Sequence, residues 1–163
     1  MCTIARIFNI ILKFGYVPNG FGIGVIVPIP KGKQNCINNI DGYRGITMCN
    51  VLSKVFEHCV LILCKNYLST SDRQFAFKKG VSCQHAIYTL NRTVNHFTSR
   101  NSTVNLCSLD LTKAFDRISH NVLIAKLIKR KLPLIIILTI FEWYSKLFSV
   151  IKWGNNTSDK FQM

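Results

Sequence analysis

The chain has 163 residues, of which 48% are hydrophobic, and its 21 Lys and Arg residues against 7 Asp and Glu residues give a net charge of +14. This apolar content excludes a disordered tail, and the length suffices for one domain with a core or for part of a larger one. Such a charge excess attracts phosphate backbones, so nucleic acid is the expected partner; the alternative is a basic surface without a defined ligand.

The cysteines and the apolar runs bear on location. None of the seven cysteines forms a Cys-x-x-Cys pair, which predicts reduced, mostly buried thiols and an intracellular protein, in the nucleus or the cytoplasm. The apolar run 7–12 is interrupted by Asn9 and lacks a cleavage site, so secretion is not expected. The run 134–141 is far shorter than the ~20 residues that span a bilayer, so no membrane association is expected.

In the first half of the chain, helical periodicity over residues 1–12 ends at turn-forming glycine and proline. Residues 24–29 are rich in β-branched residues, but their prolines argue against a long central strand. Residues 46–48 extend a second strand. Apolar spacing over 51–63 then predicts an amphipathic helix that Asn50 or Ser53 caps.

The segment 74–80 interleaves aromatic residues with lysines. Two interpretations stay open: a nucleic-acid surface, or one face of a strand in the core. Ser82 then caps a helix, which is predicted to bury an apolar stripe made of Ile87, Leu90, Val94 and Phe97.

The stretch around Asp110 is the most informative. Period-2 alternation over 104–111 predicts a strand that places Asp110 at its end, with Leu109 and Leu111 on the other face, and a helix follows to about residue 131. A carboxylate at the end of a strand suits metal or phosphate chemistry, although a helix cap is the simpler alternative. A buried helix over 134–148 and a strand over 149–153 complete the pattern.

Four stretches together resemble the reverse transcriptases of non-LTR (LINE-like) retrotransposons. They are VIVPIPKG at 25–32, YRGIT at 43–47 with LSKVFE at 52–57, QFAFKKGVS at 74–82, and SLDLTKAFDR at 108–117. The resemblance implies an α+β, right-hand polymerase fold with antiparallel strands over 25–29, 104–111 and 150–153 and helices packed on one face. It also implies a finger-like region over 1–100 and the start of a palm over 101–163. Ala76 departs from the glycine usual in the family.

The resemblance also implies roles for individual residues. Asp110 resembles the first metal-binding carboxylate, with the backbone carbonyl of Leu111 as a further ligand for Mg²⁺, or Mn²⁺ in its place. Asp116 is not expected to bind metal, because it lies more than a turn along the following helix. Lys31 and Arg44 are implied to contact the triphosphate of the dNTP, and Phe115 is implied to be the steric gate under the sugar. The residues implied to border the template are Gln74, Phe75, Lys78 and Lys79.

The implied activity is RNA-directed DNA synthesis on an RNA template from a DNA primer. In the family, the other two catalytic carboxylates come from an adjacent Asp-Asp pair, and the three carboxylates together hold two Mg²⁺ ions. No such pair occurs in these 163 residues. Because one carboxylate cannot hold two metal ions, the isolated chain is expected to be inactive. The alternative function is a basic RNA- or DNA-binding remnant without catalysis. An unpaired strand edge and apolar helix faces further predict poor solubility.

Overall fold

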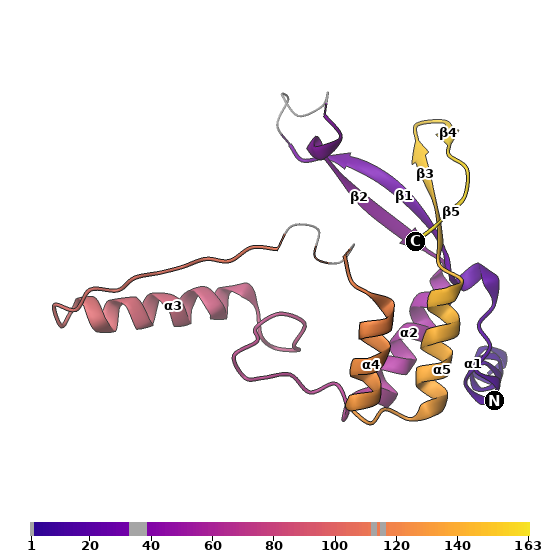
Figure 1. Cartoon of the computed structure of the whole chain (residues 1–163), viewed down its shortest axis with the longest axis horizontal. Helices are drawn as coiled ribbons and strands as arrows, with labels where there is room; N and C mark the ends of the chain where they lie inside the picture. Colours follow the sequence, from indigo (N-terminus) through magenta and orange to yellow (C-terminus); the bar gives the residue numbers. More distant parts are fainter. Residues whose placement is uncertain (1, 33–38, 112–113, 115–116) are drawn as a thin grey trace. The chain divides into compact units, whose positions relative to one another are not determined.

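The computed structural model describes residues 2–32, 39–111, 114 and 117–163. These residues form two compact units (Figure 1). Unit 1 contains Met1–Tyr67 and Ser119–Met163, and unit 2 contains Leu68–Ile118.

Unit 1 begins with helix α1, Thr3–Phe14, as its apolar periodicity predicts. The helix ends at Gly15, whose φ of 64° is in the left-handed region that glycine adopts without a steric penalty. A short 3₁₀ turn, η1 (Asn19–Phe21), then leads into the sheet.

The sheet of unit 1 is mixed, with strand order β2-β1-β3-β4 and β5 paired with β3. Strand β1 pairs antiparallel with β2 and parallel with β3. The predicted α+β class is confirmed, but the expectation of antiparallel pairing throughout is wrong at β1 and β3. The bounds are β1 Ile23–Pro30, β2 Tyr43–Cys49, β3 Phe148–Trp153, β4 Asn156–Thr157 and β5 Phe161–Gln162, with the 3₁₀ turn η3 (Ile40–Gly42) before β2.

Strand β1 lies between two neighbours, contrary to the expectation from its prolines. Parallel pairing with β3 involves only the first half of the strand, Ile23 to Ile26. Pro28 and Pro30 lie beyond it, opposite Gly45 and Tyr43 of β2. Because proline cannot donate a ladder hydrogen bond, it is tolerated where the strand has one neighbour instead of two. The prolines therefore mark where β1 becomes an edge strand.

Three further helices complete unit 1: α2 (Val51–Cys64), α4 (His120–Lys129) and α5 (Leu134–Ser145). Of the two predicted caps for α2, Asn50 is the one used, because its side chain accepts a hydrogen bond of 2.8 Å from the Leu52 N–H. Helix α5 packs against α1 and α4.

An aromatic cluster forms the core of unit 1. Phe56 of α2 is fully buried, and its ring centroid lies 5.1 Å from that of Phe8, 6.0 Å from that of Phe21 and 5.6 Å from that of Trp143. The Trp143 indole N–H also donates to the Phe21 carbonyl at 3.2 Å. These contacts join α1, η1, α2 and α5, so residues far apart in the sequence close the core together.

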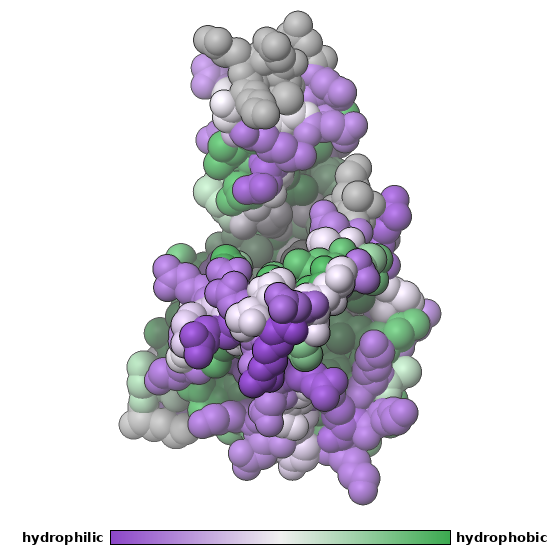
Figure 2. Space-filling model, turned by 90° about the vertical axis from the view of Figure 1, so that its left-hand side faces the viewer, coloured by the Kyte–Doolittle hydropathy of each residue, from purple (hydrophilic) through white to green (hydrophobic). Residues whose placement is uncertain are grey.

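Much apolar surface remains outside this core. Helix α5 was predicted to be buried all round, yet Leu134 is 68% exposed and Phe141 is 54% exposed, while Ile136 and Ile137 are buried. The prediction is therefore right for one face of α5 and wrong for the other. Hydrophobic side chains also lie among hydrophilic ones on the face seen in Figure 2. Within the described residues, no helix is both long and apolar enough to cross a bilayer.

Unit 2 contains one helix, α3 (Cys83–Thr98), within the residues described. Ser82 begins it, as predicted, and the Ser82 N–H donates to Nδ1 of His85 at 3.1 Å in a capping-box arrangement. The predicted burial of the apolar stripe is wrong: no residue of α3 is buried, and Ile87, Leu90 and Phe97 are 52%, 47% and 47% exposed. None of the described residues covers the helix closely enough to bury it.

The strand predicted over 104–111 is not formed. Residues 102–111 are extended but belong to no sheet, and Leu106 and Leu109 are 65% and 92% exposed. A strand requires a neighbour that accepts and donates its backbone hydrogen bonds. The alternating sequence therefore encodes a strand for which the described residues supply no pairing partner.

Candidate nucleotide and nucleic-acid site

Asp110 lies in the extended segment of unit 2. Its side chain is exposed, as is Leu111, whose exposed fraction is 79%. Four residues that follow, 112–113 and 115–116, lie outside the described residues, and these include Phe115, the predicted steric gate, and Asp116. Helix α4 covers His120–Lys129, so the predicted helix is confirmed over that range, but it is wrong at Ala114 and at residues 117–119, which are not helical. The carboxylate of Asp110 is thus accessible to solvent and ligands.

Lys31 and Arg44 lie on the β1–β2 hairpin of unit 1. Arg44 is opposite Ile29 in the antiparallel register, and the Lys31 N–H extends the ladder by donating to the Gly42 carbonyl at 2.9 Å. Because side chains alternate along a strand, Ile29, Lys31 and Arg44 share one face of the hairpin. The two predicted triphosphate contacts, separated by 12 residues in sequence, are therefore diagonal neighbours, roughly 7–8 Å apart at their Cα atoms.

The side chain of Lys31 already forms a hydrogen bond with the segment that connects the two strands. Lys31 Nζ donates to the backbone carbonyl of Asp41 at 2.7 Å. Both Lys31 and Arg44 are exposed. An anion that approaches this face meets two cations whose spacing is set by the sheet register. Among the described residues, the partner that Lys31 Nζ gives up to reach the anion is a neutral carbonyl.

The loop with Gln74, Phe75, Lys78 and Lys79 belongs to unit 2. It is not a strand, which excludes the alternative of a core strand. Lys78 Nζ donates to the Ser71 carbonyl at 2.7 Å and lies 3.6 Å from the Asp72 carboxylate. The Gln74 side chain donates to the Ala76 carbonyl at 3.1 Å.

Two positive φ angles shape this loop, at Phe77 (59°) and Gly80 (78°). Phe77 is 88% exposed, whereas Phe75 is half-buried. An exposed ring beside the exposed ammonium of Lys79 is the combination that suits stacking and phosphate contact.

The oxygen donors of the Asp110 segment suit a hard divalent cation in kind but not in number. Asp110 offers a carboxylate, and Leu111 offers a backbone carbonyl. No group of three or more His, Cys, Asp or Glu side chains that could hold a metal ion occurs within the described parts of the chain. Asp110 and the Leu111 carbonyl would therefore supply only part of the ligand set that Mg²⁺ requires.

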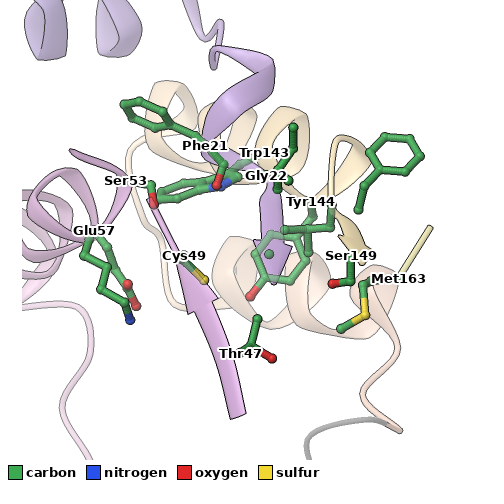
Figure 3. A pocket seen from close by; sticks show the side chains of 15 residues that line it. Phe21, Gly22, Thr47, Cys49, Ser53, Glu57, Trp143, Tyr144, Ser149 and Met163 are labelled. Atoms are coloured by element: carbon green, nitrogen blue, oxygen red, sulfur yellow. The ribbon is translucent and has the colours of Figure 1, made fainter. Parts of the chain in front are cut away.

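A pocket of about 320 Å³, which no sequence pattern predicted, lies in unit 1 (Figure 3). It is bordered by the start of β1, by β2, by the first turns of α2 and by the end of α5 with β3. Gly22 and Gly24 contribute backbone to the wall, because a Cβ at either would collide with neighbouring atoms. The segments that line this pocket are distant in sequence and meet only in the folded chain. The spacing of residues within any one segment therefore does not predict it.

Tyr144 and Glu57 are the titratable groups that characterise this pocket. Burial, and secondly the charge of Glu57, raise the pKa of the Tyr144 phenol above its ordinary value. The face of Tyr144 also meets the ring of His120 at 4.7 Å between centroids, in an edge-on arrangement. The phenol is therefore a neutral hydrogen-bond donor throughout the physiological pH range.

The chain is similar to known polymerases of mobile elements. The RNA-directed DNA polymerase from mobile element jockey of Drosophila funebris is 32% identical over 97% of this chain and 18% of its own length. The probable RNA-directed DNA polymerases from transposon BS and transposon X-element, both of Drosophila melanogaster, are 28% and 31% identical over 80% of this chain. The chain spans less than a fifth of the length of each of these relatives.

The family comparison agrees. Residues 29–163 match the family described as reverse transcriptase (RNA-dependent DNA polymerase), and this range contains all the site residues that the resemblance implied. The resemblance to reverse transcriptases of non-LTR retrotransposons is confirmed. The chain belongs to the reverse transcriptase family.

Proposed function

We propose that this chain is the part of an RNA-directed DNA polymerase that holds the triphosphate of the incoming dNTP and supplies the first metal-binding carboxylate. The observation that supports the proposal is the antiparallel β1–β2 hairpin, in which Arg44 pairs with Ile29 and Lys31, one residue beyond β1, donates its N–H to the Gly42 carbonyl. Continued alternation along this ladder puts Lys31 and Arg44 on one face. A pair of adjacent cations on a rigid hairpin is suited to a polyphosphate. Arg44 offers a planar fork of donors, and Lys31 offers a compact charge.

Asp110 is the carboxylate in this proposal. A magnesium ion, or manganese in its place, supplies charge stabilisation for nucleotidyl transfer when it is bound. Asp110 would hold it through a side-chain oxygen, and Leu111 would add its backbone carbonyl. In the same proposal Phe115 closes the space beneath the sugar and so excludes a 2′ hydroxyl.

The remaining proposed contacts concern the template. Gln74, Phe75, Lys78 and Lys79 would border the RNA strand, with the DNA primer running to Asp110. The exposed loop and its ammonium groups support this assignment. In this scheme residues 1–100 act as fingers and residues 101–163 begin the palm.

A second candidate function is nucleic-acid binding without catalysis. The net charge of +14 favours it, because phosphate neutralisation requires no metal site. The sequence contains no adjacent Asp-Asp pair. For the isolated 163-residue chain we therefore expect binding of nucleic acid and dNTP without primer extension.

The test measures the binding of a fluorescent dNTP to the purified chain by anisotropy. Arg44→Gln and Lys31→Gln should each weaken binding by about tenfold, since a charge-assisted hydrogen bond contributes roughly 1.5–3 kcal/mol. Lys65→Gln is the matched control, because Lys65 is an exposed cation at the end of α2, away from the hairpin. Equal losses in all three variants would show that only net charge attracts the nucleotide, and the hairpin assignment would then fail.

A further inference from the structure

A row of cationic and aromatic side chains runs along α3. Tyr88, Arg92 and His96 occupy every fourth position of α3, and Arg100 follows four residues later, in the turn just beyond the end of the helix at Thr98; we call these four residues the α3 row. Residues four apart lie one above the other on a helix, so the helical part of the row extends along about 12 Å of surface. All four residues are exposed, Tyr88 by 66%.

The α3 row is a connected surface. The Arg100 guanidinium contacts Nε2 of His96, and the His96 ring lies 5.3 Å from that of Phe97, edge-on. A shallow hollow follows the middle of the row and is lined by Tyr88, Thr89, Arg92, Thr93, His96 and Phe97. The hollow therefore combines two aromatic side chains with a guanidinium and small hydroxyls.

The other side of α3 is apolar. At 3.6 residues per turn, Ile87, Leu90 and Val94 face roughly the opposite direction from the middle of the α3 row, and Phe97 lies between the two faces, at the edge of the hollow. An ordinary solvated helix face mixes both signs of charge, but α3 contains no Asp or Glu between Cys83 and Thr98. The row is thus selectively cationic.

We propose that the α3 row binds a single strand of nucleic acid, with a base stacked on Tyr88 and phosphates paired with Arg92 and Arg100. Stacking on an exposed ring requires an unpaired base, which favours a single strand over a duplex. This inference rests on the proposed function in one respect, because it takes the RNA template as the strand. It adds a contact surface outside the segment 74–79.

The experiment uses the whole chain and a fluorescein-labelled oligouridine RNA of about 12 nucleotides, followed by anisotropy at several salt concentrations. Tyr88→Ala should weaken binding by about tenfold, whereas Tyr88→Phe, which keeps the ring, should bind as the unaltered chain does. Arg92→Gln should weaken binding and lower the salt slope by about 0.7, the value for one phosphate contact on a single strand. A duplex of the same length should bind more weakly than the single strand.

The matched control is Arg6→Gln, which removes an exposed arginine from the interior of another helix, α1. Circular dichroism confirms that each variant keeps its helix content. If Arg92→Gln loses no more affinity than Arg6→Gln, or if Tyr88→Ala binds like Tyr88→Phe, the α3 row is not a binding surface. That result leaves the proposed function standing. Failure of the unaltered chain to bind any RNA would overturn both this inference and the assigned template contacts.

Discussion

Phe56 is the residue whose removal should most disturb unit 1. Its ring is fully buried and contacts three other aromatic rings, from Phe8, Phe21 and Trp143. Phe56→Ala leaves a cavity that these rigid rings cannot collapse to fill. Phenylalanine-to-alanine changes in cores cost about 3–5 kcal/mol, and we expect the upper part of this range because aromatic pairs are also lost.

Urea unfolding followed by circular dichroism measures the effect. With a slope of roughly 1–3 kcal/mol per molar urea, the midpoint should fall by about 1.5 M or more. The control is Val51→Ala in the first turn of the same helix, where the side chain is 75% exposed and the change should stay within about 0.5 kcal/mol. If the two variants unfold within about 1 kcal/mol of one another, α2 does not dock through Phe56, and the aromatic core is wrongly assigned.

Three further predictions concern Gly22, Asn50 and Tyr144, which lie next to the hairpin or the pocket of unit 1. Gly22→Ala would push a Cβ into a backbone carbonyl, whereas Gly20→Ala has open space, so only the first should lower the melting temperature; equal melting would refute the close approach. Asn50→Ala removes the cap of α2 and should cost about 1 kcal/mol in urea unfolding, and no loss would mean that the cap is not used. The pKa of the Tyr144 phenol is raised in the folded chain, so the neutral phenol contributes fully to the free energy of unfolding below about pH 10. This contribution is lost as the pH rises further through the folded-state pKa. Tyr144→Phe should therefore reduce the fall in the free energy of unfolding above pH 10. The same pH profile in the variant and the unaltered chain would contradict the raised pKa of the Tyr144 phenol.

Local patterns predicted the helices well. The starts and ends of α1 and α2 follow from apolar periodicity with residues such as Gly15 and Asn50, whose conformational and hydrogen-bonding properties act within a few residues. The start of α4 was predicted too early, because the periodic spacing continues into residues 117–119, which are not helical. Strands at 24–29 and 46–48 were also predicted, although the prolines of the first argued against a central position and the pairing of the two strands was not predicted. The prolines are in fact compatible with a strand that has two neighbours for only half of its length.

The sequence was least informative where a residue depends on a distant partner. The alternation around Asp110 indicates a strand, but pairing requires a second strand that periodicity cannot supply. The apolar faces of α3 and α5 predict burial, yet burial depends on what covers them. The pocket beside Tyr144 and the parallel pairing of β1 with β3 join segments more than 100 residues apart. The candidate site also depends on a distant partner, because Lys31 and Arg44 become neighbours only through the pairing of β1 with β2, which the structure shows.

Primer extension tests the central claim most directly. Purified chain, an RNA template, a DNA primer, dNTPs and Mg²⁺ are incubated beside an Asp110→Ala variant, and RNA retention is measured in the same reactions at rising salt. We expect no extension by either chain, together with RNA retention that falls with salt, because one carboxylate cannot complete the metal site. Extension by the unaltered chain that Asp110→Ala abolishes would contradict this expectation, since these 163 residues without an Asp-Asp pair would then suffice for catalysis.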